Sequence, residues 1–207
     1  MLPAGATPAG DFLESARQGG VKGNWNPSTG VLETASGLAV QVYRRRTGWG
    51  KKETVVMFRG TAGAKDGLED WQQLFGEGEA QQYAEAAEVL RAVRESEEGP
   101  VVVAGHSLGG GQAQYALAMN AGRSGIRGVG FNTAGLSGPS LGGIEQRMGG
   151  GAVAAAGAFA TVRLADDPVS TAGIFLGRVI LVPSNGARGL AAHSITTLAR
   201  EMERNGA

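Results

Sequence analysis

The chain has 207 residues, a length typical of one compact domain whose core needs no cross-links. Lys and Arg together number 19, as do Asp and Glu, so no excess of positive charge favours a nucleic-acid-binding role. Because the sequence contains no cysteine, it excludes disulfides, thiolate metal sites and a cysteine nucleophile. Its 36 glycines, more than twice the usual share of about 7%, predict many tight turns and close backbone approaches.

Strands and helices are predicted to alternate along most of the chain. After a loose lead-in over residues 1–10, a short helix is predicted over 11–18 and a hairpin over 31–45. Further strands are predicted over residues 54–58, 101–104, 128–132, 160–164 and 179–182, and further helices over 79–96, 112–120 and 193–204. We therefore expect one α/β domain over residues 1–207, with a mostly parallel central sheet, flanking helices and an N-terminal antiparallel hairpin.

The sequence predicts neither a membrane span nor a cleavable leader. The longest weakly apolar run, residues 152–162, is far shorter than the roughly 20 residues that a membrane-spanning helix needs. The N-terminal sequence has no basic region followed by an apolar stretch, so no signal peptide is predicted. We expect a protein without a transmembrane segment that stays in the cytoplasm or is exported without a cleavable signal peptide.

Two segments match the G-x-S-x-G pattern of a nucleophile elbow, a sharp strand-to-helix turn that lifts a serine hydroxyl above a sheet. Ser107, in the sequence GHSLG, follows the apolar strand 101–104 and precedes a helical pattern, as the elbow requires. Ser140, in GPSLG, follows a loop-like stretch, and the Gly/Ala-rich residues 141–157 after it have no clear helical pattern. We take Ser107 as the candidate nucleophile and Ser140 as a turn serine. The alternative for Ser107 is a glycine-rich turn without chemistry.

The chain has two histidines that could activate this serine. A serine hydroxyl becomes a nucleophile when a base, most often histidine, accepts its proton. His106 lies beside Ser107 on the same turn, where its ring is poorly placed to reach that hydroxyl, so we interpret it as a packing residue. His193 lies at a predicted loop-to-helix junction after the last strand, and we take it as the candidate base. The alternative for His193 is an ordinary histidine at a helix start.

A carboxylate is also needed, because it fixes the tautomer of the imidazole and stabilises its charged form. In chains with this elbow the order is serine, then acid, then histidine. The acidic residues between Ser107 and His193 are Glu145, Asp166 and Asp167. Asp166 and Asp167 follow a predicted strand, where a catalytic loop would begin. Composition does not choose between these two, and the alternative is that they simply begin a turn.

Five short motifs occur in one order, and they are FRGT at 58–61, DW at 70–71, GHSLGG at 105–110, DPV at 167–169, and His193. Together they resemble the class 3 lipase family, an α/β-hydrolase branch of fatty-acyl ester hydrolases, over about two-thirds of the chain. The phrases GHSLGGGQAQYALA and FNTAGL look closer still to small bacterial lipase-like and phospholipase-like domains, which include secreted antibacterial effectors. The chain is short for a class 3 lipase and lacks the long insertions of the larger members.

The resemblance implies roles for five residues. Ser107 matches the nucleophile, His193 matches the base, and Asp167 matches the acid because the family pattern Asp-x-Val recurs as DPV. Thr61 matches the residue that offers its backbone N–H, and often its hydroxyl, to the oxyanion. The second oxyanion donor is the backbone N–H of Leu108. Such donors are worth roughly 3 kcal/mol each in the transition state.

Residues 61–78 contain a possible lid. Leu68, Trp71, Leu74 and Phe75 are spaced to form one apolar face of a short helix. Related lipases carry a lid in this region, so the resemblance implies a stripe that covers the site in water and meets lipid when open. The alternative is a helix that simply packs against the core.

These expectations combine into a serine carboxylester hydrolase that acts on fatty-acyl esters, as a lipase or a phospholipase A, through an acyl-enzyme. No metal or cofactor is expected. The expected partners are a lipid or acyl-ester substrate, a lipid surface, and an inhibitory protein if the chain is an effector; no nucleic acid is expected. The alternatives are an esterase or thioesterase for soluble substrates, and a catalytically silent α/β-hydrolase module that binds a ligand or a protein.

Overall fold

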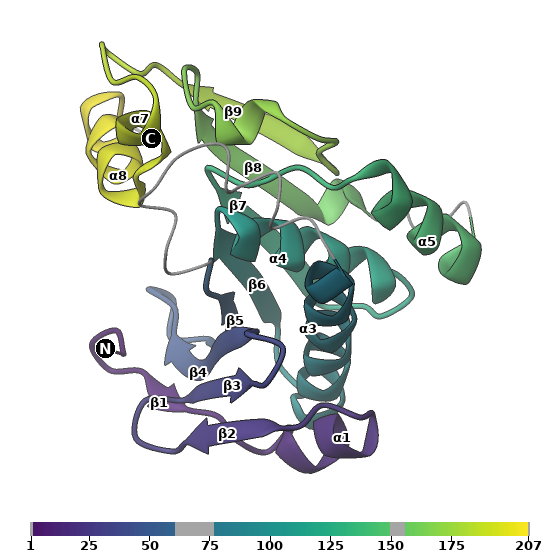
Figure 1. Cartoon of the computed structure of the whole chain (residues 1–207). Coiled ribbons are helices and arrows are strands. Elements are labelled where there is room, and N and C mark those ends of the chain that lie inside the picture. The colour runs from purple at the N-terminus through teal and green to yellow at the C-terminus, as the bar shows by residue number, and fades with distance from the viewer. Residues whose placement is uncertain (1, 61–76, 150–155, 207) are drawn as a thin grey trace.

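The computed structural model describes residues 2–60, 77–149 and 156–206. Within these ranges one nine-stranded sheet has the order β2-β3-β4-β5-β6-β7-β8-β9, with β1 paired to β4 (Figure 1). The strands are β1 (Thr7–Pro8), β2 (Gly23–Asn26), β3 (Val31–Thr34), β4 (Ala39–Arg46), β5 (Lys52–Phe58), β6 (Val101–His106), β7 (Ile126–Phe131), β8 (Phe159–Leu164) and β9 (Arg178–Val182). The helices are α1 (Leu13–Gln18), α3 (Glu77–Ser96), α4 (Leu108–Met119), α5 (Gly138–Met148), α7 (Leu190–His193) and α8 (Ile195–Arg204), and the 3-10 turns are η1 (Ala156–Ala158) and η2 (Val169–Thr171).

The sheet has an antiparallel half and a parallel half. Strands β2 to β5 pair antiparallel, and strands β5 to β9 pair parallel. Parallel neighbours run in the same direction, so the connections that leave β5 to β9 all start at one edge of the sheet. In open α/β sheets this carboxyl edge is where binding and catalytic groups gather.

Helices cover both faces of the sheet (Figure 1). On one face, α3 packs against β5 and β6 around the fully buried side chains of Leu90, Val56 and Val103. On the other face, α8 packs against β8 and β9 around Leu164 and Leu198, which are also fully buried. This is the layered arrangement expected of an α/β domain. No helix among the residues that the structure describes is long and apolar enough to cross a membrane.

Strand β6 and helix α4 form the centre of the molecule. The sequence VVVAGH of β6 is buried from Val101 to Gly105, as is typical of a strand covered on both faces. Helix α4 is rich in glycine and alanine, and its residues 108–118 are buried all around the helix. Small side chains let α4 lie close to the sheet. The turn between β6 and α4 is therefore fixed by a buried strand before it and a buried helix after it.

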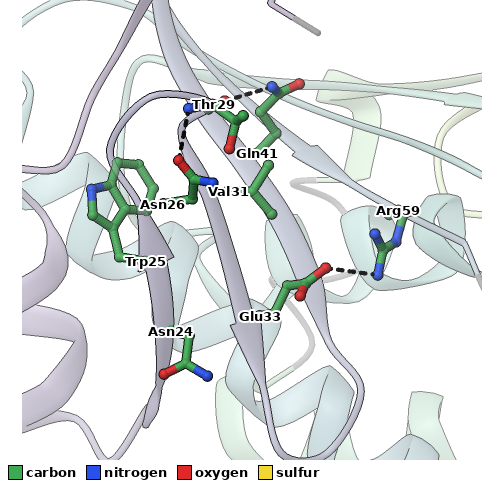
Figure 2. A pocket seen from close by; sticks show the side chains of 8 residues that line it. All are labelled: Asn24, Trp25, Asn26, Thr29, Val31, Glu33, Gln41 and Arg59. Atoms are coloured by element: carbon green, nitrogen blue, oxygen red, sulfur yellow. Dashed lines mark hydrogen bonds and ion pairs between the residues drawn. The ribbon is translucent and has the colours of Figure 1, made fainter.

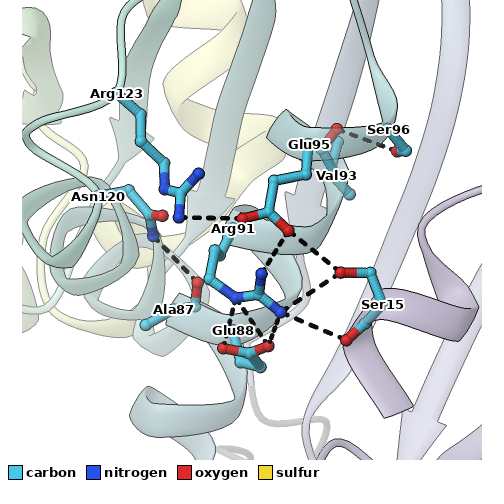
Figure 3. A network of polar contacts seen from close by, with 9 residues as sticks. All are labelled: Ser15, Ala87, Glu88, Arg91, Val93, Glu95, Ser96, Asn120 and Arg123. Atoms are coloured by element: carbon cyan, nitrogen blue, oxygen red, sulfur yellow. Dashed lines mark hydrogen bonds and ion pairs between the residues drawn. The ribbon is translucent and has the colours of Figure 1, made fainter. Parts of the chain in front are cut away.

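A polar network joins α1, α3 and the residues after α4 (Figure 3). The guanidinium of Arg91 on α3 pairs with Glu88 and Glu95 of the same helix. It also donates to the carbonyl oxygen of Ser15 on α1 at 3.3 Å. Glu95 pairs in addition with Arg123 at 3.0 Å. Because such partly exposed pairs contribute at most about 1 kcal/mol each, the network orients α1 more than it stabilises the fold.

The structure differs from the sequence expectations in four places. The sheet is half antiparallel rather than mostly parallel, because β1 and β2 add to the antiparallel strands β3 and β4. Helix α5 forms where no helix was predicted, because Ser137 caps its first turn and Pro139 suits the first helical positions. The helix predicted over 193–204 corresponds to α8, whereas His193 ends a separate short helix, α7, and the extended backbone of Ser194 lies between the two. Two strands were not predicted: β1 lies within the segment expected to be a loose lead-in, and β2 forms the edge of the antiparallel half.

Candidate active site

A strained turn presents Ser107 between β6 and α4. Its φ of 60° and ψ of −128° lie in a region that residues other than glycine rarely adopt. A Cβ atom on Gly105 would lie 2.1 Å from the carbonyl oxygen of Gly109, and one on Gly109 would lie 2.3 Å from that of Phe58. Both glycines of the motif are therefore required by a close backbone approach. Ser107 lies at the carboxyl end of the central strand.

Ser107, His193 and Asp167 form one hydrogen-bonded chain. Nε2 of His193 lies 2.9 Å from Oγ of Ser107, and Nδ1 of His193 lies 3.0 Å from each carboxylate oxygen of Asp167. The three side chains come from the β6–α4 turn, the loop after β8 and helix α7, and all three residues are buried. A carboxylate accepts but does not donate, so Nδ1 of His193 carries the proton and its Nε2 lone pair faces the serine hydroxyl.

Of the acidic residues between Ser107 and His193, Asp167 is the one that reaches the imidazole. Its Oδ1 also accepts a hydrogen bond from the backbone N–H of Val169 at 3.0 Å, which orients the carboxylate. Asp166 is exposed, and its backbone N–H donates to the hydroxyl of Ser184 at 2.9 Å. Glu145 is exposed on α5.

Ser140, the serine of the second G-x-S-x-G match, lies in the first turn of α5. Its backbone N–H donates to Oγ of Ser137 at 3.3 Å, and the two hydroxyls lie 2.9 Å apart. These contacts are those of a helix cap. Ser140 thus lies within a helix, whereas it was expected to be a turn serine with no clear helix after it.

His106 contacts His193 rather than Ser107. Its Nε2 lies 2.9 Å from the carbonyl oxygen of His193, and the two ring centroids are 4.9 Å apart. Burial is the main cause that lowers the pKa of His106 below its ordinary value, so its ring is neutral at pH 7. A carbonyl only accepts, and Nε2 is therefore the nitrogen that carries the proton. The interpretation of His106 as a packing residue misses this hydrogen bond.

Leu108, whose backbone N–H is an expected oxyanion donor, is the first residue of α4. The first N–H groups of a helix have no acceptor within the helix and point out of its N-terminus. The Leu108 N–H thus lies at the helix end that adjoins Ser107. Thr61, the other expected donor, lies outside the described residues. The expected lid residues Leu68, Trp71, Leu74 and Phe75 also lie outside them, and the lid stays a prediction.

A depression of about 430 Å³ on the antiparallel half has mostly polar walls, and the described residues that line it include no serine or histidine (Figure 2). Its lining residues are Asn24, Trp25, Asn26, Thr29, Val31, Glu33, Gln41 and Arg59. Their polar groups bond to one another: Gln41 donates to the carbonyl oxygen of Thr29 at 2.7 Å, and Arg59 pairs with Glu33 at 3.1 Å. Over the part of the chain that the structure describes, no group of three or more His, Cys, Asp or Glu could hold a metal ion.

Fold and site together define a lipase-like α/β domain, with a serine on a strained turn after a central parallel strand and a His–Asp pair at the same edge. A family model for phospholipase-like proteins, described as a Tle-like phospholipase domain, matches residues 22–163. This match covers more than half of the chain, which therefore belongs to the family of Tle-like phospholipase domains. The matched residues include Ser107 and end before Asp167 and His193.

Solved lipase structures share the fold at low sequence identity. The native Rhizomucor miehei lipase propeptide complex superposes with a TM-score of 0.50 at 15% identity, over 86% of this chain and 65% of that one. A deletion mutant of the same complex gives a TM-score of 0.51 at 14% identity, over 86% of this chain and 64% of that one. The chain thus spans less than two thirds of the length of these lipase structures. No curated protein sequence matches it.

Proposed function

We propose that this chain is a serine carboxylester hydrolase of the lipase or phospholipase A type, with Ser107 as nucleophile, His193 as base and Asp167 as acid. One observation carries the proposal: a hydroxyl, an imidazole and a carboxylate form an unbroken chain of contacts at 2.9 and 3.0 Å within a buried edge of the sheet. A silent binding module has no need of a serine held in a strained backbone conformation opposite a histidine, so the strain favours a nucleophile.

The first half-reaction transfers the acyl group to the protein. Nε2 of His193 accepts the hydroxyl proton while Oγ of Ser107 forms a bond to the carbonyl carbon, whose π electrons move to the oxygen. The backbone N–H of Leu108 donates to this oxyanion, and Thr61 supplies the second donor that the family resemblance implies. When the tetrahedral intermediate collapses, the ester C–O bond breaks, and the leaving alcohol takes the proton from His193.

The second half-reaction returns the protein to its resting state. A water molecule gives a proton to Nε2 of His193 and attacks the acyl carbon, and the new intermediate expels Oγ of Ser107, which recovers the proton. In both halves the imidazole becomes an imidazolium, and the carboxylate of Asp167 stabilises this charge at 3.0 Å. The carboxylate also prevents the ring from turning over, because it accepts from Nδ1 only.

Family membership supports a phospholipid as the substrate. The family model describes phospholipase-like domains, and the lipase structures support only the fold. We assign the reaction to a fatty-acyl ester of a phospholipid. A triglyceride lipase and an esterase for soluble substrates use the same residues and are distinguished by the choice of substrate.

The nucleophile is tested by fluorophosphonate labelling of the purified chain with peptide mapping. We expect an adduct on Ser107, none in the Ser107→Ala variant, and labelling at the unmodified rate in the matched control Ser140→Ala. An unlabelled chain, or an adduct on Ser140, would overturn the assignment. The substrate class is tested by fatty-acid release from phosphatidylcholine vesicles compared with hydrolysis of p-nitrophenyl butyrate. Activity confined to the soluble ester would overturn the phospholipase assignment and leave the nucleophile intact.

A further inference from the structure

Helix α7, which carries His193, is too short to hold its own position. It has four residues, Leu190–His193, whereas isolated helices shorter than about 12 residues are marginal in water. Its last carbonyl oxygens have no N–H donor within the helix, so they accept hydrogen bonds from donors elsewhere. The position of the imidazole therefore depends on what fixes the end of α7.

Two side chains from the sheet donate to the end of α7. Nε2 of His106 donates to the carbonyl oxygen of His193 at 2.9 Å, and Nδ2 of Asn132 donates to that of Ala192 at 2.9 Å. His106 is the last residue of β6, immediately before Ser107, and Asn132 follows the neighbouring strand β7. The two parallel strands that border the nucleophile thus each hold one carbonyl group of the helix that carries the base.

Both donors are themselves fixed. Asn132 is fully buried with a φ of 41°, and its Oδ1 accepts from the backbone N–H of Leu164 at 3.0 Å. A non-glycine residue in this left-handed region is retained where the surroundings hold it firmly. His106 packs its ring against that of His193 at 4.9 Å, tilted by 35°. The neighbours leave little freedom to either side chain.

The two histidines carry their protons on opposite nitrogens. His193 is protonated on Nδ1 because Asp167 accepts there, and its Nε2 faces Ser107. His106 is protonated on Nε2 because the carbonyl oxygen of His193 accepts there. His106 therefore contributes a neutral donor to the backbone of His193 without competing for the serine proton.

We propose that His106 is a positioning residue that, together with Asn132, sets the distance between the His193 imidazole and the Ser107 hydroxyl through hydrogen bonds to the end of α7. The proposal rests on the proposed function, because it concerns the same nucleophile and base. Its physical basis is that a misplacement of about 1 Å between reacting groups can lower a rate a hundredfold.

Side-chain length allows a sharp test at position 106. In glutamine the amide nitrogen is as many bonds from Cα as Nε2 of histidine, so His106→Gln keeps the donor to His193. In asparagine the amide is one bond shorter, so His106→Asn keeps the chemistry and loses the reach. With p-nitrophenyl butyrate as substrate, we expect kcat of His106→Asn to fall by about 10- to 100-fold with little change in KM. We expect His106→Gln to recover most of this loss.

Controls separate positioning from stability. Leu90→Ala opens a cavity in the core beneath α3 and lowers the melting temperature, and we expect it to keep the unmodified kcat below its own melting transition. In a His193→Ala background, His106→Asn should cause no further loss of rate, because His106 acts through the imidazole. A further loss in that background would overturn the proposal.

A spectroscopic readout does not depend on turnover. The proton on Nδ1 of His193, which Asp167 accepts, gives a far-downfield NMR signal that we expect to broaden or shift in His106→Asn and to persist in His106→Gln. Equal behaviour of the Gln and Asn variants, in signal or in kcat, would overturn the role of donation. Failure of the proposed function is distinguishable, since the unmodified chain would then show no fluorophosphonate adduct on Ser107.

Discussion

The two G-x-S-x-G turns of this chain share a sequence pattern and differ in almost every physical respect. At Ser107 the flanking glycines 105 and 109 face backbone atoms at 2.1 and 2.3 Å from where a Cβ would lie, and the serine backbone has a φ of 60°. At Ser140 the flanking glycines 138 and 142 have nothing within 4 Å of that position. The turn at Ser107 thus requires glycine at both flanking positions, whereas the turn at Ser140 has room for a side chain at both.

The difference comes from what precedes each serine. Ser107 follows a strand buried on both faces, so the chain must leave the sheet abruptly and enter a helix that lies close against it. Ser140 follows a helix-capping serine and continues the first turn of α5. A short motif is therefore a stronger indication of a nucleophile when a buried strand leads into it, because the strand places the serine on a strained turn close to the ends of neighbouring strands.

The largest expected effect distinguishes the two serines directly. Ser107→Ala should lower ester hydrolysis by about 10⁴- to 10⁶-fold, the loss typical of a removed triad nucleophile. Ser140→Ala should stay within twofold of the unmodified rate. Initial rates with p-nitrophenyl butyrate measure both. A comparable loss in the two variants would remove the functional difference between the turns.

The proposed acid, Asp167, can be tested by replacing its carboxylate with an amide of the same shape. Asp167→Asn cannot hold the Nδ1–H tautomer of His193 and should lower kcat by about 10³- to 10⁴-fold. Asp166→Asn is the matched control, because Asp166 is the adjacent residue and its side chain is exposed. We expect this variant to leave kcat nearly unchanged. The check is kcat at pH 8 with circular dichroism to confirm the fold, and equal losses would leave the acid unassigned.

The glycines of the two turns should respond to alanine in opposite ways. Gly109→Ala forces a Cβ against the Phe58 carbonyl oxygen. An overpacked core typically loses about 1–3 kcal/mol of stability, and we expect this variant to lose at least that much. Gly142→Ala, in the interior of α5 with open space around it, should stabilise by about 0.5–1 kcal/mol. Urea unfolding measures both free energies. A stable Gly109→Ala variant would show that the close approach is not required.

The smallest expected effect belongs to the cap of the second turn. Ser137→Ala removes the acceptor for the Ser140 backbone N–H and should lower the free energy of unfolding by about 1 kcal/mol. Ester hydrolysis should not change. Thermal unfolding together with a rate assay checks this, and a loss of activity at unchanged stability would give α5 a role in the site.

Most of the parallel half could be predicted from its sequence. The run VVVA of β6, followed by glycines, identifies a buried strand and its elbow without any tertiary information. The candidate base followed by elimination, since His106 adjoins Ser107 and His193 is the other histidine. The choice of Asp167 over Asp166 needed the family resemblance, because adjacent residues on a loop differ only in the direction of their side chains.

What the sequence did not predict depends on contacts between distant segments. Strand β2, with the sequence GNWN, has little intrinsic strand propensity and forms because it pairs with β3 while Trp25 packs edge-on against Phe12 at 5.7 Å. Helix α5 was not predicted because its glycines have low helix propensity, although the helix-start signals Ser137 and Pro139 were present in the sequence. The hydrogen bond from His106 depends on where α7 ends, which no local pattern shows. Thr61 and the lid stay predictions.

Ser107 and His193 are 86 positions apart in the chain. Ribosomes add about 5–20 residues per second, so a nascent chain carries its nucleophile for roughly 4–17 seconds before its base is made. Under the proposed mechanism the serine is inert during that time, because nothing accepts its proton. Under that mechanism the order of synthesis delays ester hydrolysis until β9 has joined the sheet and α7 has formed.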